Sequence, residues 1–380
     1  MKKRILFIIS DTGGGHRSAA NAISAELGMD AECKMADLLR GSGLPGIRNA
    51  PEIYSYFSAG HIWLHNLLFR LSDSRFVMDL VSGLLYRMAR PRIKKMVDEF
   101  GPDIVVVIHP LAVRPMCYHR DSTNAPWPVV TVVTDLVSVH ASWITKEADL
   151  YLLPTCEAVE IAKNAGVSPD RIHLSGFPVH SRFLSTQPDR AAARQLLGIE
   201  RNRFTVLITS GGAGGGRVKE LVEELENECP ECTLLVVTGR NAELRNRLSN
   251  RPAPNKNLRI YGFVDNMDLL MAACDIIVTK AGPGTIMEAA TFARSLIITG
   301  AVGLQEAGNI DFVQSNNLGT YCPKRGDAGR ESARLSSETR GVEKSVTNPE
   351  EKSQFAGTRN IAKILLELPG RTGKYPGPAG

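Results

Sequence analysis

The sequence predicts an α/β protein made of two doubly wound parallel-sheet domains in tandem. Two stretches share one pattern: short apolar runs at 4–10 and 204–210 are each followed by clustered glycines and then by a helical pattern. Further near-continuous apolar runs are typical of strands buried on both faces. Alternating strands and helices give parallel sheets with right-handed crossovers, and two such series imply two Rossmann-like domains facing across a cleft.

Each half supplies enough elements for its own sheet. In the first half we expect a helix at 17–27 and strands at 4–10, 104–108, 129–133, 151–153 and 172–174. In the second half we expect a helix at 218–226 and strands at 204–210, 234–238, 258–261, 276–279 and 296–299. The 380 residues exceed what one hydrophobic core usually serves, which also favours two domains.

Composition shifts set the expected boundaries. The first domain is expected at 1–184 and the second at 190–323, with a Ser/Thr/Gln/Pro linker between them. The 324–355 segment is poor in apolar residues and is expected to be irregular or disordered. A C-terminal helix at 360–368 and a frayed tail should complete the 356–380 segment.

The 41–97 segment is an insertion that mixes Leu and aromatic residues with a basic end. This mixture suits an amphipathic segment lying in a membrane interface. A helical hairpin packed on the sheet is the alternative.

Charge and cysteine content exclude several classes of protein. A net charge of +5 is too mild for nucleic-acid binding but suits contact with anionic lipid. We expect neither a signal peptide nor a transmembrane span, and therefore a peripheral protein on the cytoplasmic face of the cell membrane. Seven scattered cysteines argue against a disulfide framework. The lone Cys229–Cys232 CxxC is interpreted as a helix-to-strand connection rather than a metal site.

The clearest binding motif begins where the strand at 276–279 ends. Lys280 precedes Gly282, Pro283 and Gly284, and a helix is expected to begin near Thr285. A helix N-terminus offers N–H groups and a positive dipole end to an anionic diphosphate. Glu288, one turn into the helix, could accept hydrogen bonds from ribose hydroxyls. A Gly-Pro-Gly turn standing alone would also fit a purely structural role.

Neighbouring strand ends add polar groups to this motif. In a doubly wound sheet, the loops after the carboxyl ends of strands line the ligand crevice. Amide and carboxylate groups suit sugar hydroxyls, and such groups are expected in the loop after 296–299. The backbone after the strand at 258–261 could read a base edge, and the glycine loop after 204–210 could close over the diphosphate. The residues concerned are Gln305, Glu306, Asn309, Gly262, Phe263, Val264, Gly211, Gly212 and Gly214.

Together with Gly239-Arg240-Asn241, these motifs resemble the monogalactosyldiacylglycerol synthases and the processive diacylglycerol glucosyltransferases of glycosyltransferase family 28. The N-terminal half resembles them as well, over about 2–323 in all, whereas 324–355 departs from the pattern. The N-terminal motifs are Asp11-Thr12-Gly13-Gly14-Gly15-His16, Thr134-Asp135-Leu136, Trp143 and Gly176-Phe177-Pro178-Val179.

The resemblance implies a GT-B fold with UDP-hexose in the C-terminal domain, where Arg240 would join the donor site. Diacylglycerol and an anionic membrane surface would meet the N-terminal domain. The resemblance also implies inversion at the sugar, with no metal and no cofactor. UDP-galactose and UDP-glucose remain open as donors, and so does the oligomeric state.

Inversion needs a general base for the acceptor hydroxyl, and His16 is the candidate. It follows the glycine turn after the first strand, and histidine titrates near neutral pH. Asp135 is the rival base, and a helix-start histidine with only local hydrogen bonds is the structural alternative. The acceptor and lipid are expected near Gly14, Gly15, His109, His140 and Trp143.

Three other functions share these features. A transferase acting on a polyprenyl-diphosphate-linked sugar would have the same donor site. A UDP-sugar epimerase would have the same fold, and a non-catalytic nucleotide-binding protein would keep only the binding residues.

Overall fold

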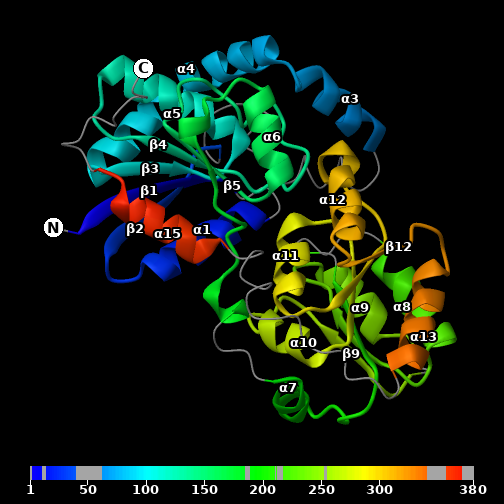
Figure 1. Ribbon diagram of the computed structural model, residues 1–380. Helices are drawn as coiled ribbons and strands as arrows, with labels where there is room; N and C mark the ends of the chain where they lie inside the picture. Colours follow the sequence, from blue (N-terminus) through cyan, green and yellow to red (C-terminus); the bar gives the residue numbers. More distant parts are fainter. Residues whose placement is uncertain are drawn as a thin grey trace. The chain divides into compact units, whose positions relative to one another are not determined.

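The computed structural model describes residues 2–10, 14–39, 62–184, 189–209, 211, 217–251, 255–339 and 357–369 (Figure 1). The chain forms two compact α/β units. The first unit contains Met1–Ser181, Gly303–Gln305 and Ala356–Gly380, and the second contains Arg182–Val302 and Glu306–Phe355. The C-terminal segment therefore belongs with the first unit.

The first unit is a six-stranded parallel sheet with helices on both faces. Its strands are β1 (Lys3–Ile9), β2 (Ala31–Asp37), β3 (Ile104–Val107), β4 (Val129–Val132), β5 (Leu150–Leu153) and β6 (Ile172–Leu174). Its helices are α1 (Gly15–Leu27), α3 (Ile62–Ser72), α4 (Arg75–Phe100), α5 (Pro110–Thr123), α6 (Cys156–Asn164) and α15 (Thr358–Glu367), with 3-10 turns at Pro169–Arg171 and Ser181–Phe183. The strand order is β2-β1-β3-β4-β5-β6.

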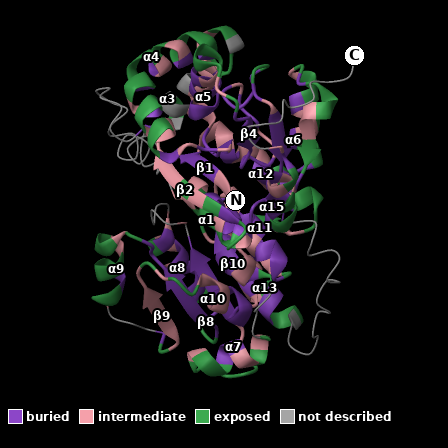
Figure 2. Cartoon of the chain, turned by 90° about the vertical axis from the view of Figure 1, so that its left-hand side faces the viewer, coloured by how far each residue is buried: buried purple, intermediate pink, exposed green. Residues whose placement is uncertain are grey.

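Strand side chains alternate between two cores in this unit. Ile5 and Phe7 of β1 pack with α1 and α15, whereas Leu6 and Ile8 pack with α4, α5 and α6 on the opposite face. Figure 2 shows the central strands buried, the edge strand β2 at intermediate burial and the outer faces of the helices exposed. Each fully buried aliphatic side chain contributes about 1.5–3 kcal/mol through removal from water. The continuous apolar runs in the sequence reflect this burial on both faces.

The second unit repeats the architecture. Its strands are β7 (Thr205–Thr209), β8 (Thr233–Val237), β9 (Leu258–Tyr261), β10 (Ile276–Thr279), β11 (Ser295–Ile298) and β12 (Gly319–Tyr321). Its helices are α7 (Arg190–Leu197), α8 (Val218–Glu228), α9 (Ala242–Ser249), α10 (Met267–Ala273), α11 (Pro283–Thr291), α12 (Gly303–Ser315, of which Gly303–Gln305 belong to the first unit) and α13 (Asp327–Thr339). The parallel strands follow the order β12-β11-β10-β7-β8-β9.

Helix α13 corrects the expectation that 324–355 is irregular. Ala328, Ser332, Leu335 and Ser336 are buried and recur at helical spacing, and α13 packs against α8. The exposed Arg334 pairs with Glu331 three residues earlier, which supports the helix. The apolar stripe is narrow and includes serine, so composition alone does not reveal it. Residues 340–355 lie outside the described part of the chain.

Two edge strands, β2 and β12, also escape the sequence analysis. In β2 only Ala31 is buried, and two of the three residues of β12 are exposed. Neither strand carries the apolar run of a central strand. The expected C-terminal helix is confirmed as α15, two residues earlier than expected.

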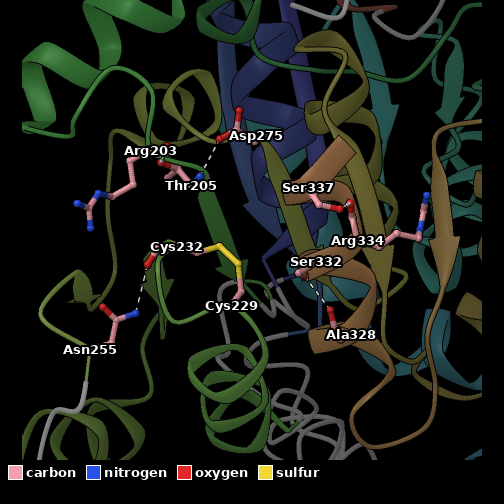
Figure 3. The surroundings of a disulfide bond; sticks show 10 residues. All are labelled: Arg203, Thr205, Cys229, Cys232, Asn255, Asp275, Ala328, Ser332, Arg334 and Ser337. Carbon is pink, nitrogen blue, oxygen red and sulfur yellow. Dashed lines mark hydrogen bonds between the residues drawn. A yellow bond between two sulfur atoms is a disulfide. The ribbon is translucent and has the colours of Figure 1, made fainter. Parts of the chain in front are cut away.

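The CxxC segment joins α8 to β8, as expected, and Cys229 and Cys232 form a disulfide there (Figure 3). The disulfide itself is not predicted by the sequence analysis. Both cysteines are buried in the core beneath α8. Within the described ranges, no group of three or more His, Cys, Asp and Glu side chains is arranged to hold a metal ion.

The described part of the 41–97 insertion forms α3 and most of α4, while 41–61 lies outside the described residues. Helix α4 buries Met78, Leu85, Ala89 and Ile93 toward the sheet. None of the helices that the structure describes is both long and apolar enough to cross a membrane.

Candidate functional site

The first unit has a switch point between β1 and β3. From β1 the chain crosses through α1 to β2 on one side, and from β3 it crosses through α5 to β4 on the other. Such reversals open a crevice at the carboxyl ends of the strands. His16 lies in the first turn of α1, and His109 is the N-cap residue of α5. Their ring centroids are 4.9 Å apart in an edge-on arrangement.

Gly14 makes the turn that delivers His16. It is the N-cap residue of α1 and has a φ of 85°, in the left-handed region that glycine tolerates best. Gly15 follows as the first residue of the helix and is exposed. The glycine cluster therefore positions a histidine directly above the end of β1.

The segment after β4 brings Thr134 and Trp143 to His16 and places Asp135 against Trp143. Thr134 Oγ1 is 3.3 Å from His16 Nδ1, and the Trp143 ring centroid is 6.2 Å from that of His16. The Trp143 indole Nε1–H donates to Asp135 Oδ2 at 2.6 Å. The sequence analysis assigns no role to Thr134. Its position beside Asp135, at the carboxyl end of a strand, is the signal that could have found it.

Burial keeps both histidines neutral. It lowers the pKa of His16 to about 4. Burial, together with the neighbouring His16, lowers the pKa of His109 well below its usual value. Both imidazoles are therefore uncharged near pH 7.

His140 and Trp143, which the sequence places near the lipid, are both buried. His140 is buried, with Nδ1 2.8 Å from Ser142 Oγ and Nε2 3.2 Å from the Phe69 carbonyl oxygen. It thus links the segment after β4 to the end of α3. Trp143 is fully buried, so its side chain offers a lipid no exposed surface in this structure.

The second unit has its switch point between β7 and β10. Gly211 follows β7 with a φ of 80°, and Gly282 is the N-cap residue of α11 after β10. Pro283 fills the first helical position, where its missing N–H costs nothing. Among the described residues, no side chain caps the first N–H groups of α11. Gly212 and Gly214 lie outside the described residues.

Lys280 is tied to the start of α12. Its Nζ donates to Glu306 Oε1 at 2.7 Å, and Glu306 Oε2 accepts from the Val302 N–H at 2.9 Å. Asn309 Nδ2 donates to the Ala281 carbonyl at 2.8 Å. Glu306 and Asn309 are buried and brace the turn before α11.

The prediction of a loop at Gln305, Glu306 and Asn309 is wrong, because these residues lie in α12. Gly303 and Gly308 suggest a loop in the sequence. However, the Glu306 side chain satisfies an N–H group at the helix start, where an acidic residue also suits the dipole. Gln305 remains partly exposed in the first turn.

Helix α11 also carries Glu288. Burial raises the pKa of Glu288 to about 7, with Arg182 opposing that rise. Gly284 and Thr285 occupy the first turn and are only partly buried. The helix therefore presents N–H groups at its start and a titratable carboxyl in its second turn.

An exposed guanidinium and an exposed aromatic ring lie close together after β8 and β9. The Arg240 guanidinium carbon lies 5.1 Å from the centroid of the Phe263 ring, which is 57% exposed. A Cβ on Gly262 would come within 3.4 Å of Arg245 Nη1, so glycine leaves room for this arginine. Val264 follows in the same loop and is partly buried. An exposed aromatic ring and a guanidinium suit stacking with a planar group.

Comparisons with known proteins cover both units. Residues 16–179 match the family profile of monogalactosyldiacylglycerol (MGDG) synthase, and residues 205–303 match the glycosyltransferase family 28 C-terminal domain. The probable monogalactosyldiacylglycerol synthase 2 of rice (Oryza sativa subsp. japonica) is 30% identical over 345 residues, or 87% of this chain and 73% of that protein. The spinach (Spinacia oleracea) monogalactosyldiacylglycerol synthase is 31% identical over 84% of this chain and 63% of that protein.

Solved structures show the same fold. The glycotransferase of kitacinnamycin has a TM-score of 0.60 at 14% identity, covering 96% of this chain and 98% of that one. The UDP-GlcNAc 2-epimerase from Neisseria meningitidis has a TM-score of 0.57 at 13% identity, covering 97% and 99%. At such identities the likeness concerns the fold alone, which is the two-domain GT-B fold. Because transferases and epimerases share it, the fold does not select the reaction.

Proposed function

Because the chain belongs to the monogalactosyldiacylglycerol synthase family, it is a glycosyltransferase, and we propose that it moves a hexose from UDP-galactose or UDP-glucose to diacylglycerol. The curated relatives are named for this glycolipid. The observation that carries the proposal is the neutral His16, held beside Thr134 and Trp143 at the switch point of the first unit.

We propose that the second unit binds the donor. The N–H groups at the start of α11 and the dipole of that helix would meet the diphosphate. Lys280 forms an ion pair with Glu306 that offsets its charge, so the start of α11 would attract the diphosphate more strongly than Lys280. Glu288 would contact the ribose, and the Arg240–Phe263 surface would stack with the uracil. Gln305, which is partly exposed, would contact the sugar.

Transfer would proceed by direct displacement. His16 takes the proton of the acceptor hydroxyl as that oxygen bonds to C1 of the sugar. The bond from C1 to the diphosphate oxygen breaks, and UDP leaves with the electron pair. Attack from the face opposite UDP converts an α-linked donor into a β-glycoside. Charge on the departing diphosphate would be stabilised by N–H donors already in place, so no metal is required.

His16 is favoured over Asp135 as the base for a structural reason. Asp135 Oδ2 already accepts a short hydrogen bond from the Trp143 indole, so this oxygen is engaged by a neighbouring side chain. His16 is unprotonated at neutral pH. Asp135 would instead orient the acceptor or stabilise the imidazolium that forms on His16.

We propose that α3 and α4 rest on the membrane that holds the acceptor. Trp63, Leu67 and Leu71 form an exposed stripe on α3, and an exposed stripe of Leu80, Leu84 and Met88 runs along α4. Arg87, Arg90, Lys94 and Lys95 lie exposed farther along α4. Apolar stripes beside basic side chains suit a surface rich in anionic lipid.

A labelling assay tests the activity. Radiolabelled UDP-galactose and UDP-glucose are each incubated with the protein and diacylglycerol in micelles containing anionic lipid. We expect a β-monoglycosyldiacylglycerol from one or both donors, undiminished by EDTA. His16→Ala should lose turnover while it still binds UDP in calorimetry. No glycolipid from either donor would overturn the proposal, and conversion of UDP-GlcNAc to its 2-epimer would favour the epimerase alternative.

A further inference from the structure

We propose that Trp143 is a positioning residue that holds the Asp135 carboxylate with its indole N–H while its ring contacts His16. This inference rests on the proposed function, because it assigns Trp143 a role in that reaction. It also differs from the expected contact with lipid, since the Trp143 side chain is fully buried.

The indole is suited to this task by its chemistry. Trp Nε1–H is only a donor, so it matches an ionised carboxylate and cannot compete for the proton that the base must take. The distance of 2.6 Å from Nε1 to Asp135 Oδ2 is short for such a bond. Asp135 is itself buried, and a buried carboxylate needs a donor to compensate for lost hydration.

The same side chain touches the base. The Trp143 ring centroid is 6.2 Å from that of His16, with the two planes tilted by 60°. One rigid bicyclic group therefore contacts His16 with its ring and Asp135 with its N–H. Thr134 precedes Asp135 in the chain, and its Oγ1 lies within hydrogen-bond distance of His16 Nδ1.

The indole is in turn held by its own segment. The backbone N–H of Trp143 donates to the His140 carbonyl at 2.9 Å, and the backbone N–H of Thr145 donates to the Tyr151 hydroxyl at 2.7 Å. Arg114 Nη1 donates to the Ala141 carbonyl at 3.0 Å. Bonds on both sides of Trp143 fix its backbone, so the indole N–H has little freedom to leave Asp135.

A pair of tryptophan variants tests the role. Trp143→Phe keeps an aromatic ring but removes the donor, while Trp127→Phe changes a buried tryptophan in the core of the same unit, away from the site. Loss of one hydrogen bond to a charged group should lower kcat about 10- to 100-fold in Trp143→Phe with little change in donor KM. Trp127→Phe should lower thermal stability without that loss of kcat. Equal kcat in the two variants would overturn the proposal.

A cleaner variant removes only the N–H. Replacing Trp143 with 3-benzothienylalanine exchanges the N–H for sulfur at almost constant shape. It should reproduce the loss of kcat seen in Trp143→Phe. Retained activity here, with loss in Trp143→Phe, would mean that ring packing matters and that the hydrogen bond does not.

The contact itself has a spectroscopic signature. The chain has three tryptophans, so its indole N–H groups give three NMR signals, and Trp143→Phe identifies one of them. Asp135→Asn should shift that signal and leave those of Trp63 and Trp127 in place. An unmoved Trp143 signal would refute the contact.

This measurement separates two failures. If wild-type protein makes no glycolipid yet the Trp143 signal responds to Asp135→Asn, the proposed function fails while the contact stands. If glycolipid forms but Trp143→Phe retains full kcat, only the positioning role fails.

Discussion

At the scale of single residues, burial keeps the His16 imidazole neutral but makes the folded protein less stable at low pH. Its folded pKa of about 4 lies below the ordinary histidine value of about 6.5. Between these two pH values His16 is protonated in the unfolded chain but not in the folded chain. The stability linked to His16 is therefore fully present above about pH 6.5 and is lost as the pH falls toward 4.

The pH dependence of catalysis should follow the same shift. In the free enzyme His16 stays deprotonated down to about pH 4, so kcat/KM should show no acid limb near pH 6.5. The measurement is kcat/KM for the donor between pH 4.5 and 8 in the Glu288→Gln variant, so that the titration of Glu288 does not contribute. A fall centred near pH 6.5 would mean that His16 is more exposed than the structure has it, or that another histidine is the base.

Thr134 should act on the proton position of His16. When His16 Nδ1–H donates to Thr134 Oγ1, Nε2 is left as the proton acceptor. Thr134→Val keeps the shape but removes the bond, and kcat should fall about tenfold, the value of one ordinary hydrogen bond. Thr134→Ser restores a hydroxyl and should recover most of the rate. Equal rates in the Val and Ser variants would show that the bond has no catalytic role.

Glu288 should make donor binding depend on pH. Its raised pKa of about 7 means that the carboxyl is neutral below pH 7 and ionised above it. Only the ionised form accepts hydrogen bonds from hydroxyls with both oxygens, so the donor KM should rise as the pH falls through 7. Glu288→Gln should remove this dependence. A wild-type KM that stays constant from pH 6 to 8 would argue against contact between Glu288 and the ribose.

At the scale of elements, prediction succeeds where the local pattern decides the structure. Strands β9 and β10 begin and end as expected because their apolar runs stop at glycine-containing turns. Helix α12 is predicted as a loop because Gly303 and Gly308 favour loops, whereas the bond from the Val302 N–H to Glu306 that supports the helix start is not visible in the sequence. Helix α13 depends on packing against α8, and a short window of sequence does not reveal that partner.

The exposed stripes of α3 and α4 predict how the protein meets lipid. Leu80→Ser with Leu84→Ser removes two exposed apolar side chains from α4 and should reduce flotation with liposomes that contain anionic lipid. Wild-type flotation should also weaken as salt screens the basic residues. Leu196→Ser, an equally apolar change at an exposed site of α7, is the matched control. Flotation that ignores both salt and the α4 changes would rule out this surface.

At the scale of the whole molecule, the repeated strand–glycine–helix pattern was enough to predict two sheets and the strand ends that carry each site. It did not predict which ends would meet. His16 and His109 are 93 positions apart in the chain, and only the pairing of β1 with β3 brings them together. The Trp143–Asp135 bond escaped for another reason, because it depends on how an irregular segment folds back on itself.

The chain returns to its first unit at the end, and this gives α15 a structural role. Ile361 and Leu365 are fully buried in the core shared with α1 and β1. Lys3 Nζ donates to the Leu365 carbonyl at 3.2 Å, which satisfies a helix end that would otherwise lack donors. The first unit is therefore completed by residues more than 350 positions from its first strand.

Removing the Leu365 side chain should destabilise the first unit selectively. Leu365→Ala should cost about 2–5 kcal/mol of its free energy of unfolding, the usual range for a buried leucine. All three tryptophans, Trp63, Trp127 and Trp143, belong to the first unit, so tryptophan fluorescence in urea reports its unfolding. Leu225→Ala makes the same change in the core of the second unit and is the matched control. A midpoint lowered by Leu365→Ala but unmoved by Leu225→Ala would show that α15 stabilises the first unit and that the two units unfold independently. Equal shifts would instead mean that the two units unfold as one.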